Sequence, residues 1–122
     1  MDAVDPTFAP DEKAAPVATI NDHTATASQW QQVQSWINYT DPNGDAAVRY
    51  EFWDSGTEVG SGYFWTPSNS HWDANTTIPV EAADLKNVWV SGGQTAGSET
   101  MWVRAFDGAN WSDWDSFFLI TA

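Results

Sequence analysis

Apolar and polar residues alternate along two stretches of the chain. Every second residue is apolar over residues 48–53 (VRYEFW), and the same pattern recurs over residues 101–106 (MWVRAF). Because successive side chains of a strand point to opposite faces, this alternation predicts two strands that each bury one face. Asp107 and Gly108 then form a turn signal, and a return strand over residues 111–120 completes a predicted β-hairpin.

Shorter apolar segments recur about every ten residues and predict a fold built almost entirely from strands. Further short strands are predicted at residues 17–20, 61–65, 78–80 and 88–90. One segment has helical spacing, with Ser28 and Gln31 in the form of a capping box, and it predicts a short helical turn near residues 28–36. The pattern as a whole predicts an all-β fold, an antiparallel β-sandwich of about seven strands.

The first residues differ in character from the rest of the chain. Residues 1–16 contain three prolines and four acidic residues without any periodic pattern. This composition is typical of an interdomain linker. Residues 17–122 are therefore predicted to be the folded domain, and a secretion signal, if the protein is exported, is expected outside this chain.

Composition restricts the classes of partner. The chain has a formal net charge of −13, and this charge disfavours binding to nucleic acid and to anionic lipid headgroups. No apolar run is long enough for membrane insertion. The chain has nine tryptophans and no cysteine, so the fold is expected to be held by packing, with a metal ion as an additional support, and not by disulfides.

A dense turn signal precedes the first alternating stretch. Asp41, Asn43 and Asp45 surround Gly44 and place oxygen-bearing side chains at alternate positions, an arrangement that suits Ca²⁺. The same residues also form tight turns without any ion. The residue twelfth in the loop is Phe52, where an EF-hand has Glu, so the full EF-hand pattern is missing. A calcium site and a plain turn both remain open.

Two segments resemble known repeat families. The ending MWVRAFDGANWSDWDSFFLITA resembles the end of a fibronectin type III domain, and NYTDPNGDAAVRYEFWD resembles cadherin-like and immunoglobulin-like repeats of large bacterial surface proteins exported by type I secretion. The resemblance implies an extracellular module on the cell surface, with neighbouring repeats of the same polypeptide as partners and calcium as a ligand. The chain departs from the family at Asn43, where the repeats have Asp, and it lacks glycine-rich nonapeptide repeats.

The segment around Trp111 and Trp114 resembles the Trp-Ser-x-Trp-Ser signature of cytokine receptor domains. In that family the tryptophans stack with arginines of the neighbouring strand. Arg104 lies on the outward row of the predicted neighbouring strand, so the resemblance implies a cation–π contact with one of these rings, and Arg49 with Trp53 would extend the stack. The alternative is that these rings only cover one face of a sheet.

Two non-enzymatic functions follow from these patterns. The first is a structural spacer, one unit in a string of similar units. The alternative is a carbohydrate-binding module that uses exposed tryptophans, with Trp65 and Trp72 as candidates beside Trp53, and a cell-surface glycan as the ligand. An enzyme is not predicted, because His23 and His71 lie far from any nucleophile signature, although paired carboxylates are not visible from sequence alone.

Overall fold

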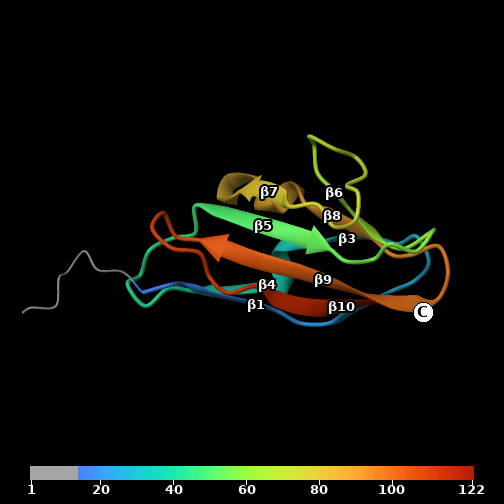
Figure 1. Cartoon of the computed structure of the whole chain (residues 1–122), viewed down its shortest axis with the longest axis horizontal. Helices are drawn as coiled ribbons and strands as arrows, with labels where there is room; N and C mark the ends of the chain where they lie inside the picture. The colour runs from blue at the N-terminus through green and yellow to red at the C-terminus, as the bar shows by residue number, and fades with distance from the viewer. Residues whose placement is uncertain (1–13) are drawn as a thin grey trace, which may run out of the picture.

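The structure is a computed structural model that describes residues 14–122, and within them the chain forms ten strands and two 3₁₀ helices (Figure 1). The strands are β1 (Val17–Ile20), β2 (His23–Ala25), β3 (Trp30–Gln32), β4 (Ile37–Thr40), β5 (Arg49–Asp54), β6 (Tyr63–Trp65), β7 (Ile78–Glu81), β8 (Trp89–Ser91), β9 (Gly97–Phe106) and β10 (Asp115–Thr121). The helices are η1 (Gln34–Trp36) and η2 (Ala82–Asn87). Neither helix in this described part of the chain has the length or hydrophobicity to span a bilayer.

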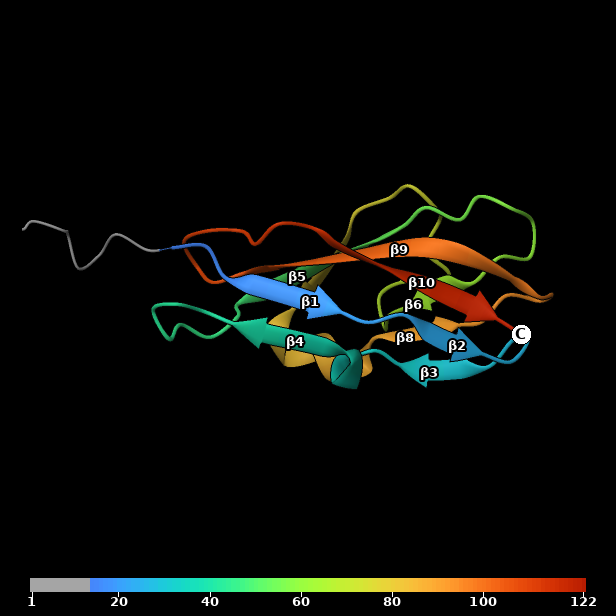
Figure 2. The same cartoon turned by 90° about the horizontal axis from the view of Figure 1, so that it is seen from below.

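The strands form three sheets that face one another across an apolar core. The largest sheet has five strands in the order β2-β10-β9-β5-β7, and a second has three strands in the order β3-β8-β6. β1 and β4 pair as a separate ribbon beside β10 (Figures 1 and 2). The all-β character predicted from the sequence is confirmed, and the arrangement is consistent with a β-sandwich.

The core lies between the sheets and is filled by the apolar rows of the alternating strands. Phe52 on β5 and Phe64 on β6 are fully buried, and their ring centroids lie 5.2 Å apart, which joins the five-stranded sheet to the three-stranded sheet. Val103 on β9 and Leu119 on β10 are also fully buried. The two-residue period therefore places one side of each long strand in the core.

The hairpin of β9 and β10 is confirmed, with Met101 opposite Phe117 in an antiparallel register. Its connection is longer than predicted, because β10 begins at Asp115 while Trp111 forms only an isolated bridge with Phe106. Ser112 explains this geometry. Its hydroxyl accepts a hydrogen bond from the Ala105 N–H at 2.9 Å, so the connection folds back on the end of β9.

Three expectations need correction. The pairing is not wholly antiparallel, because β2 runs parallel to β10. The helical turn is limited to η1, and residues 30–32 form β3, which pairs with β8. Ser28 has a left-handed backbone (φ 58°), so the chain reverses there and the capping box does not form. The structure has more strands than the seven predicted. The additional strands β2 to β4 have only three or four residues each and are too short to give a periodic pattern.

The described chain enters and leaves at opposite ends of its long axis (Figure 1). The predicted linker over residues 1–16 lies outside the described residues up to residue 13. Of the remaining linker residues, Pro16 is buried, and the Ala14 N–H donates a hydrogen bond to Asn43 Oδ1 at 3.0 Å. The β4–β5 loop is thus in contact with the entering segment, at the end of the molecule opposite the C-terminus.

Candidate functional site: an acidic cluster at the entry end

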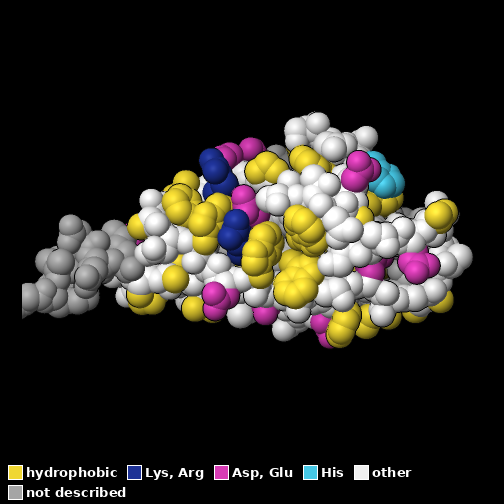
Figure 3. All heavy atoms as spheres, in the orientation of Figure 1, with side chains coloured by type: hydrophobic (Ala, Val, Ile, Leu, Met, Phe, Trp, Pro, Cys, Tyr) yellow, Lys and Arg dark blue, Asp and Glu magenta, His cyan; other side chains and the backbone are white. Residues whose placement is uncertain are grey.

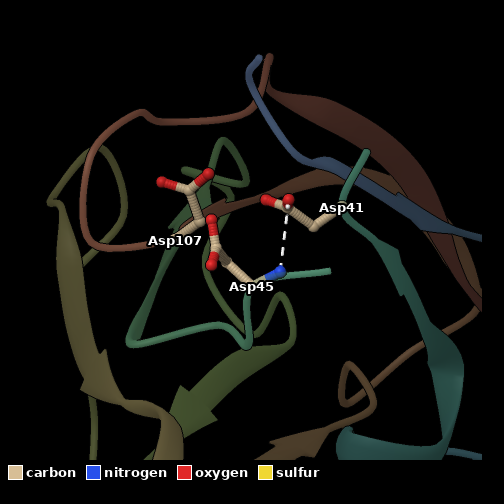
Figure 4. A group of neighbouring side chains, drawn as sticks. All are labelled: Asp41, Asp45 and Asp107. Carbon is tan, nitrogen blue, oxygen red and sulfur yellow. Dashed lines mark hydrogen bonds between the residues drawn. The ribbon is translucent and has the colours of Figure 1, made fainter. Parts of the chain in front are cut away.

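Three aspartates meet where the β4–β5 loop approaches the loop after β9. Asp41 and Asp45 come from the first loop, and Asp107 follows the last residue of β9. One carboxylate oxygen of each lies within 4.8 Å of the others. Figure 4 shows the three side chains facing one another, although Asp107 is far from the other two in the sequence.

Local hydrogen bonds explain why the two loops adopt these shapes. Asp41 Oδ1 accepts hydrogen bonds from the Asn43 N–H at 2.8 Å and the Asp45 N–H at 3.3 Å, and Gly44 takes a left-handed φ of 76° to close the turn. Asp107 Oδ1 closes its own turn in the same way, accepting from the Ala109 N–H at 2.8 Å and the Asn110 N–H at 2.7 Å. In each turn, one carboxylate oxygen of the aspartate is therefore occupied by backbone hydrogen bonds.

The second oxygens of two of these aspartates are left without a partner. Asp41 Oδ2 and Asp107 Oδ2 are buried and accept no hydrogen bond from the described residues. Asp107 is 94% buried, since only 6% of its surface is exposed. A buried carboxylate oxygen without a hydrogen-bond donor is unfavourable unless a cation compensates for it. The donor set of the cluster therefore fits a hard cation.

The electrostatics of the site also favour a positive ligand. The backbone N–H of Asn110 lowers the pKa of Asp107 despite the opposing effect of burial, so this carboxylate is ionised at neutral pH. Burial, followed by the charges of Asp41 and Asp107, raises the pKa of nearby Tyr39 to about 12. Tyr39 therefore stays protonated even in alkaline solution, and its hydroxyl donates a hydrogen bond to the Asp45 carbonyl oxygen at 2.9 Å.

The structure changes the residue set that the sequence indicated. Asp41 and Asp45 meet as expected, but Asn43 Oδ1 faces the entering chain and accepts from the Ala14 N–H. Asp107 takes the third position instead. The sequence signal at Asp107 and Gly108 indicated only a hairpin turn, and nothing in it showed that this turn would lie against the β4–β5 loop.

A second arrangement lies on the outer face of the five-stranded sheet. The guanidinium carbon of Arg104 lies 4.2 Å from the ring centroid of Trp111 and 4.7 Å from that of Trp114. Both Nε and Nη2 of Arg104 also donate to Glu51 Oε1, at 2.9 and 2.6 Å. Hydrophobic and basic side chains gather over β5 and β9 in Figure 3. The structure thus brings Arg104, Trp111 and Trp114 together.

Arg49 and Trp53 do not extend this stack. Arg49 Nε pairs with Glu81 Oε2 at 3.0 Å, which turns its side chain toward the edge strand β7. Trp53 lies opposite Trp102 in the β5–β9 register. The predicted extension is therefore replaced by two separate contacts.

The Arg104 stack gives a prediction with a matched control. Arg104→Ala is expected to lower the free energy of unfolding by about 2 kcal/mol, because it removes two cation–π contacts and leaves Glu51 without its partner. Arg49→Ala removes an ion pair whose side chains are 45% and 56% exposed, and it is expected to cost about 0.5 kcal/mol or less. Urea denaturation of both variants measures the difference, and equal losses would contradict a stabilising stack.

The tryptophans proposed for sugar binding have different surroundings. Trp72 is half-buried against the core, and its Nε1–H donates to Thr66 Oγ1 at 2.9 Å, so its ring is less exposed than expected, although it lines a polar cavity beneath the β5–β6 loop. The polar residues around Trp72 in the sequence gave no indication of this contact, because it forms only when the long β6–β7 loop folds back over the sheet. Trp65 lies with Trp30 and Trp89, and together they line a shallow cavity of about 430 Å³.

The two histidines have separate stacking partners. His23 stacks on Trp36 with ring centroids 3.8 Å apart, and His71 stacks on Tyr63 at 3.7 Å. The sequence did not reveal a pair of carboxyl groups inside the fold, Asp54 on β5 and Glu99 on β9. Burial, followed by the charge of Asp54, raises the pKa of Glu99 to about 8. Burial likewise raises the pKa of Asp54 to about 6.

No protein-family model, curated protein or solved structure matches the chain. The likeness to immunoglobulin-like, fibronectin type III and cadherin-like repeats therefore stays a prediction from the sequence.

Proposed function

We propose that this domain is a non-enzymatic, immunoglobulin-like repeat module of a bacterial surface protein or adhesin, located outside the cell and acting as a spacer that calcium stiffens. The observation that carries the proposal is the cluster of Asp41, Asp45 and Asp107 at the end where the chain enters. Its partners would be neighbouring repeats of the same polypeptide.

The chemistry of the cluster favours Ca²⁺ among the common cations. Calcium prefers oxygen ligands at about 2.3–2.6 Å and accepts irregular geometry. Two oxygens bound to one such ion are separated by at most about 5 Å, and the three carboxylate oxygens lie within 4.8 Å of one another. Asp41 Oδ2 and Asp107 Oδ2 would gain in the ion the partner that the protein does not supply. Carbonyl oxygens and water would complete the coordination.

The position of the cluster supports the spacer role. A cation there would tie the β4–β5 loop to the loop after β9, and Asn43 connects the first of these loops to the entering segment through Ala14. The ion would thereby restrict the angle between this domain and a preceding one. Entry and exit at opposite ends suit a string of domains, and a net charge of −13 would keep neighbours apart until cations neutralise it.

The proposal predicts that calcium binds and stabilises the domain. At a concentration of about one hundred times Kd, Ca²⁺ is expected to add about 2.7 kcal/mol to the free energy of unfolding and to raise Tm by about 10 °C. Asp107→Asn is expected to abolish this gain, while its Oδ1 can still accept the backbone hydrogen bonds that close the turn. Calorimetric titration and thermal unfolding with and without calcium measure both effects.

Asp84→Asn is the matched control, because Asp84 is an exposed aspartate in η2 outside the cluster and its loss is expected to leave calcium binding unchanged. The absence of both heat and a shift in Tm would contradict the calcium site. In a protein with two tandem copies, calcium is expected to increase the maximum dimension in small-angle scattering. Equal dimensions with and without the ion would contradict stiffening even if calcium binds.

A further inference from the structure

Three tryptophans share the outer face of the three-stranded sheet. Trp65 on β6 lies directly opposite Trp89 on β8. Trp30 on β3 lies opposite Ser91, two residues farther along β8. Phe64 and Val90, which alternate with them, point inward and are fully buried. The sheet therefore presents its indoles outward. We call Trp30, Trp65 and Trp89 the indole platform.

The platform contains the two most exposed tryptophans of residues 14–122. Trp30 is 44% exposed and Trp89 is 37% exposed. Within residues 14–122 no indole N–H of the platform donates a hydrogen bond, whereas Trp72 donates to Thr66 and Trp102 donates to Ser55. The platform thus offers ring faces and free donors that the fold does not use.

A polar cavity adjoins the platform and shares Trp30 with it. This cavity has a volume of about 450 Å³ and lies beneath the β5–β6 loop. Tyr63, stacked on His71, forms one wall, and Trp30 contacts Tyr63 edge to face at 5.5 Å between ring centroids. Further lining groups that can form hydrogen bonds are Asp54, Asp73 and Gln94. Flat aromatic faces thus lead directly into a set of hydrogen-bonding side chains.

We propose that the indole platform and the adjoining cavity bind a neutral polysaccharide. The C–H face of a pyranose stacks on an indole, while its hydroxyl groups need donors and acceptors of the kind that line the cavity. All three side chains that line the platform cavity are tryptophans, and the adjoining cavity adds hydrogen-bonding side chains, a combination that suits a ligand with apolar ring faces and many hydroxyl groups. The net charge of −13 and the carboxyl groups of the cavity disfavour anionic glycans.

The platform gives the domain a ligand-binding activity in addition to the proposed spacer role. It shares no residue with the acidic cluster, which is formed by the β4–β5 loop and the loop after β9, whereas the platform lies on the three-stranded sheet. Binding is therefore expected in EDTA as well as in calcium. A failure of calcium binding and a failure of polysaccharide binding would then be observed separately.

Affinity electrophoresis tests the proposal with four neutral polysaccharides: hydroxyethylcellulose, soluble starch, galactomannan and arabinoxylan. At least one is expected to retard the native domain, and Trp30→Ala and Trp89→Ala are each expected to weaken that binding about tenfold. Trp53→Ala is the control, since Trp53 lines a different cavity of about 410 Å³ over the five-stranded sheet and its loss is expected to leave binding unchanged.

A measurement on the native domain removes any dependence on how the variants fold. In spectra of the ¹⁵N-labelled protein, the polysaccharide is expected to shift the indole N–H signals of Trp30, Trp65 and Trp89 and to leave that of Trp102, bound to Ser55, in place. Retardation by none of the four polymers would overturn the proposal. So would binding lost only in Trp53→Ala, or a concentration-dependent dimer that Trp89→Ala abolishes, because a second copy would then cover the platform.

Discussion

Phe52→Ala is expected to lower the free energy of unfolding by about 3–5 kcal/mol. Phe52 is fully buried on β5, and its ring packs on Phe64 across the space between the two larger sheets. Alanine would remove the transfer free energy of the ring and leave a cavity at the contact that joins the layers. Urea denaturation followed by tryptophan fluorescence measures the loss.

Phe118→Ala provides the control, because Phe118 is 50% exposed on the outer face of β10. Its loss is expected to cost about 0.5 kcal/mol or less, as for most surface substitutions. A similar cost for the two phenylalanines would contradict the assignment of β5 and β6 to facing layers of one core. A small cost at position 52 alone would have the same meaning.

Glu99→Gln is expected to stabilise the domain at pH 8 and to have little effect at pH 4. Because the pKa of Glu99 is raised from 4.5 to about 8, its protonated form is favoured by folding. The stability that Glu99 contributes is complete below its unfolded pKa and is lost as pH rises toward the folded value. A tenfold change in the proton affinity of a carboxylate corresponds to about 1.4 kcal/mol. Because Glu99 is partly exposed, solvent screens the effect, and its total contribution to the free energy of unfolding is about 2 kcal/mol.

Glutamine reproduces the protonated carboxyl group at every pH. Its amide can donate to Asp54, which is 1% exposed, and its oxygen can accept from the Gly62 N–H as Glu99 Oε2 does at 2.5 Å. Thermal unfolding at pH 4, 6 and 8 measures the effect. Glu58→Gln, at an exposed position in the β5–β6 loop, is expected to show no such dependence on pH. A native domain whose stability does not fall between pH 5 and pH 8 would contradict the raised pKa of Glu99.

The Asp54–Glu99 pair also bears on the proposed polysaccharide site. Asp54 lines the cavity next to the indole platform, and its Oδ1 accepts from the Gly56 N–H at 2.8 Å. Gly62 approaches Glu99 so closely that a side chain at this position would lie 2.9 Å from Oε2. The pair therefore holds both ends of the β5–β6 loop, and that loop forms the roof of the cavity.

Local pattern was sufficient to predict the long strands and the direction of their side chains. Alternation over residues 48–53 and 101–106 predicted β5 and β9 and placed Arg104 on the outward row, where the structure has it beside Trp111. These features depend on the two-residue period of a strand, which is a local property and so is visible in any short window of the amino-acid sequence.

Which distant residues meet could be seen only in the folded molecule. Strands that lie far apart in the chain pair with one another and bring three groups of residues together. These groups are the acidic cluster, the indole platform and the carboxyl pair of Asp54 and Glu99. Short strands such as β2 carry too few residues for a periodic signal, and β2 forms because β10 offers it a partner. Long-range pairing, and not local pattern, thus set the acidic cluster and the indole platform.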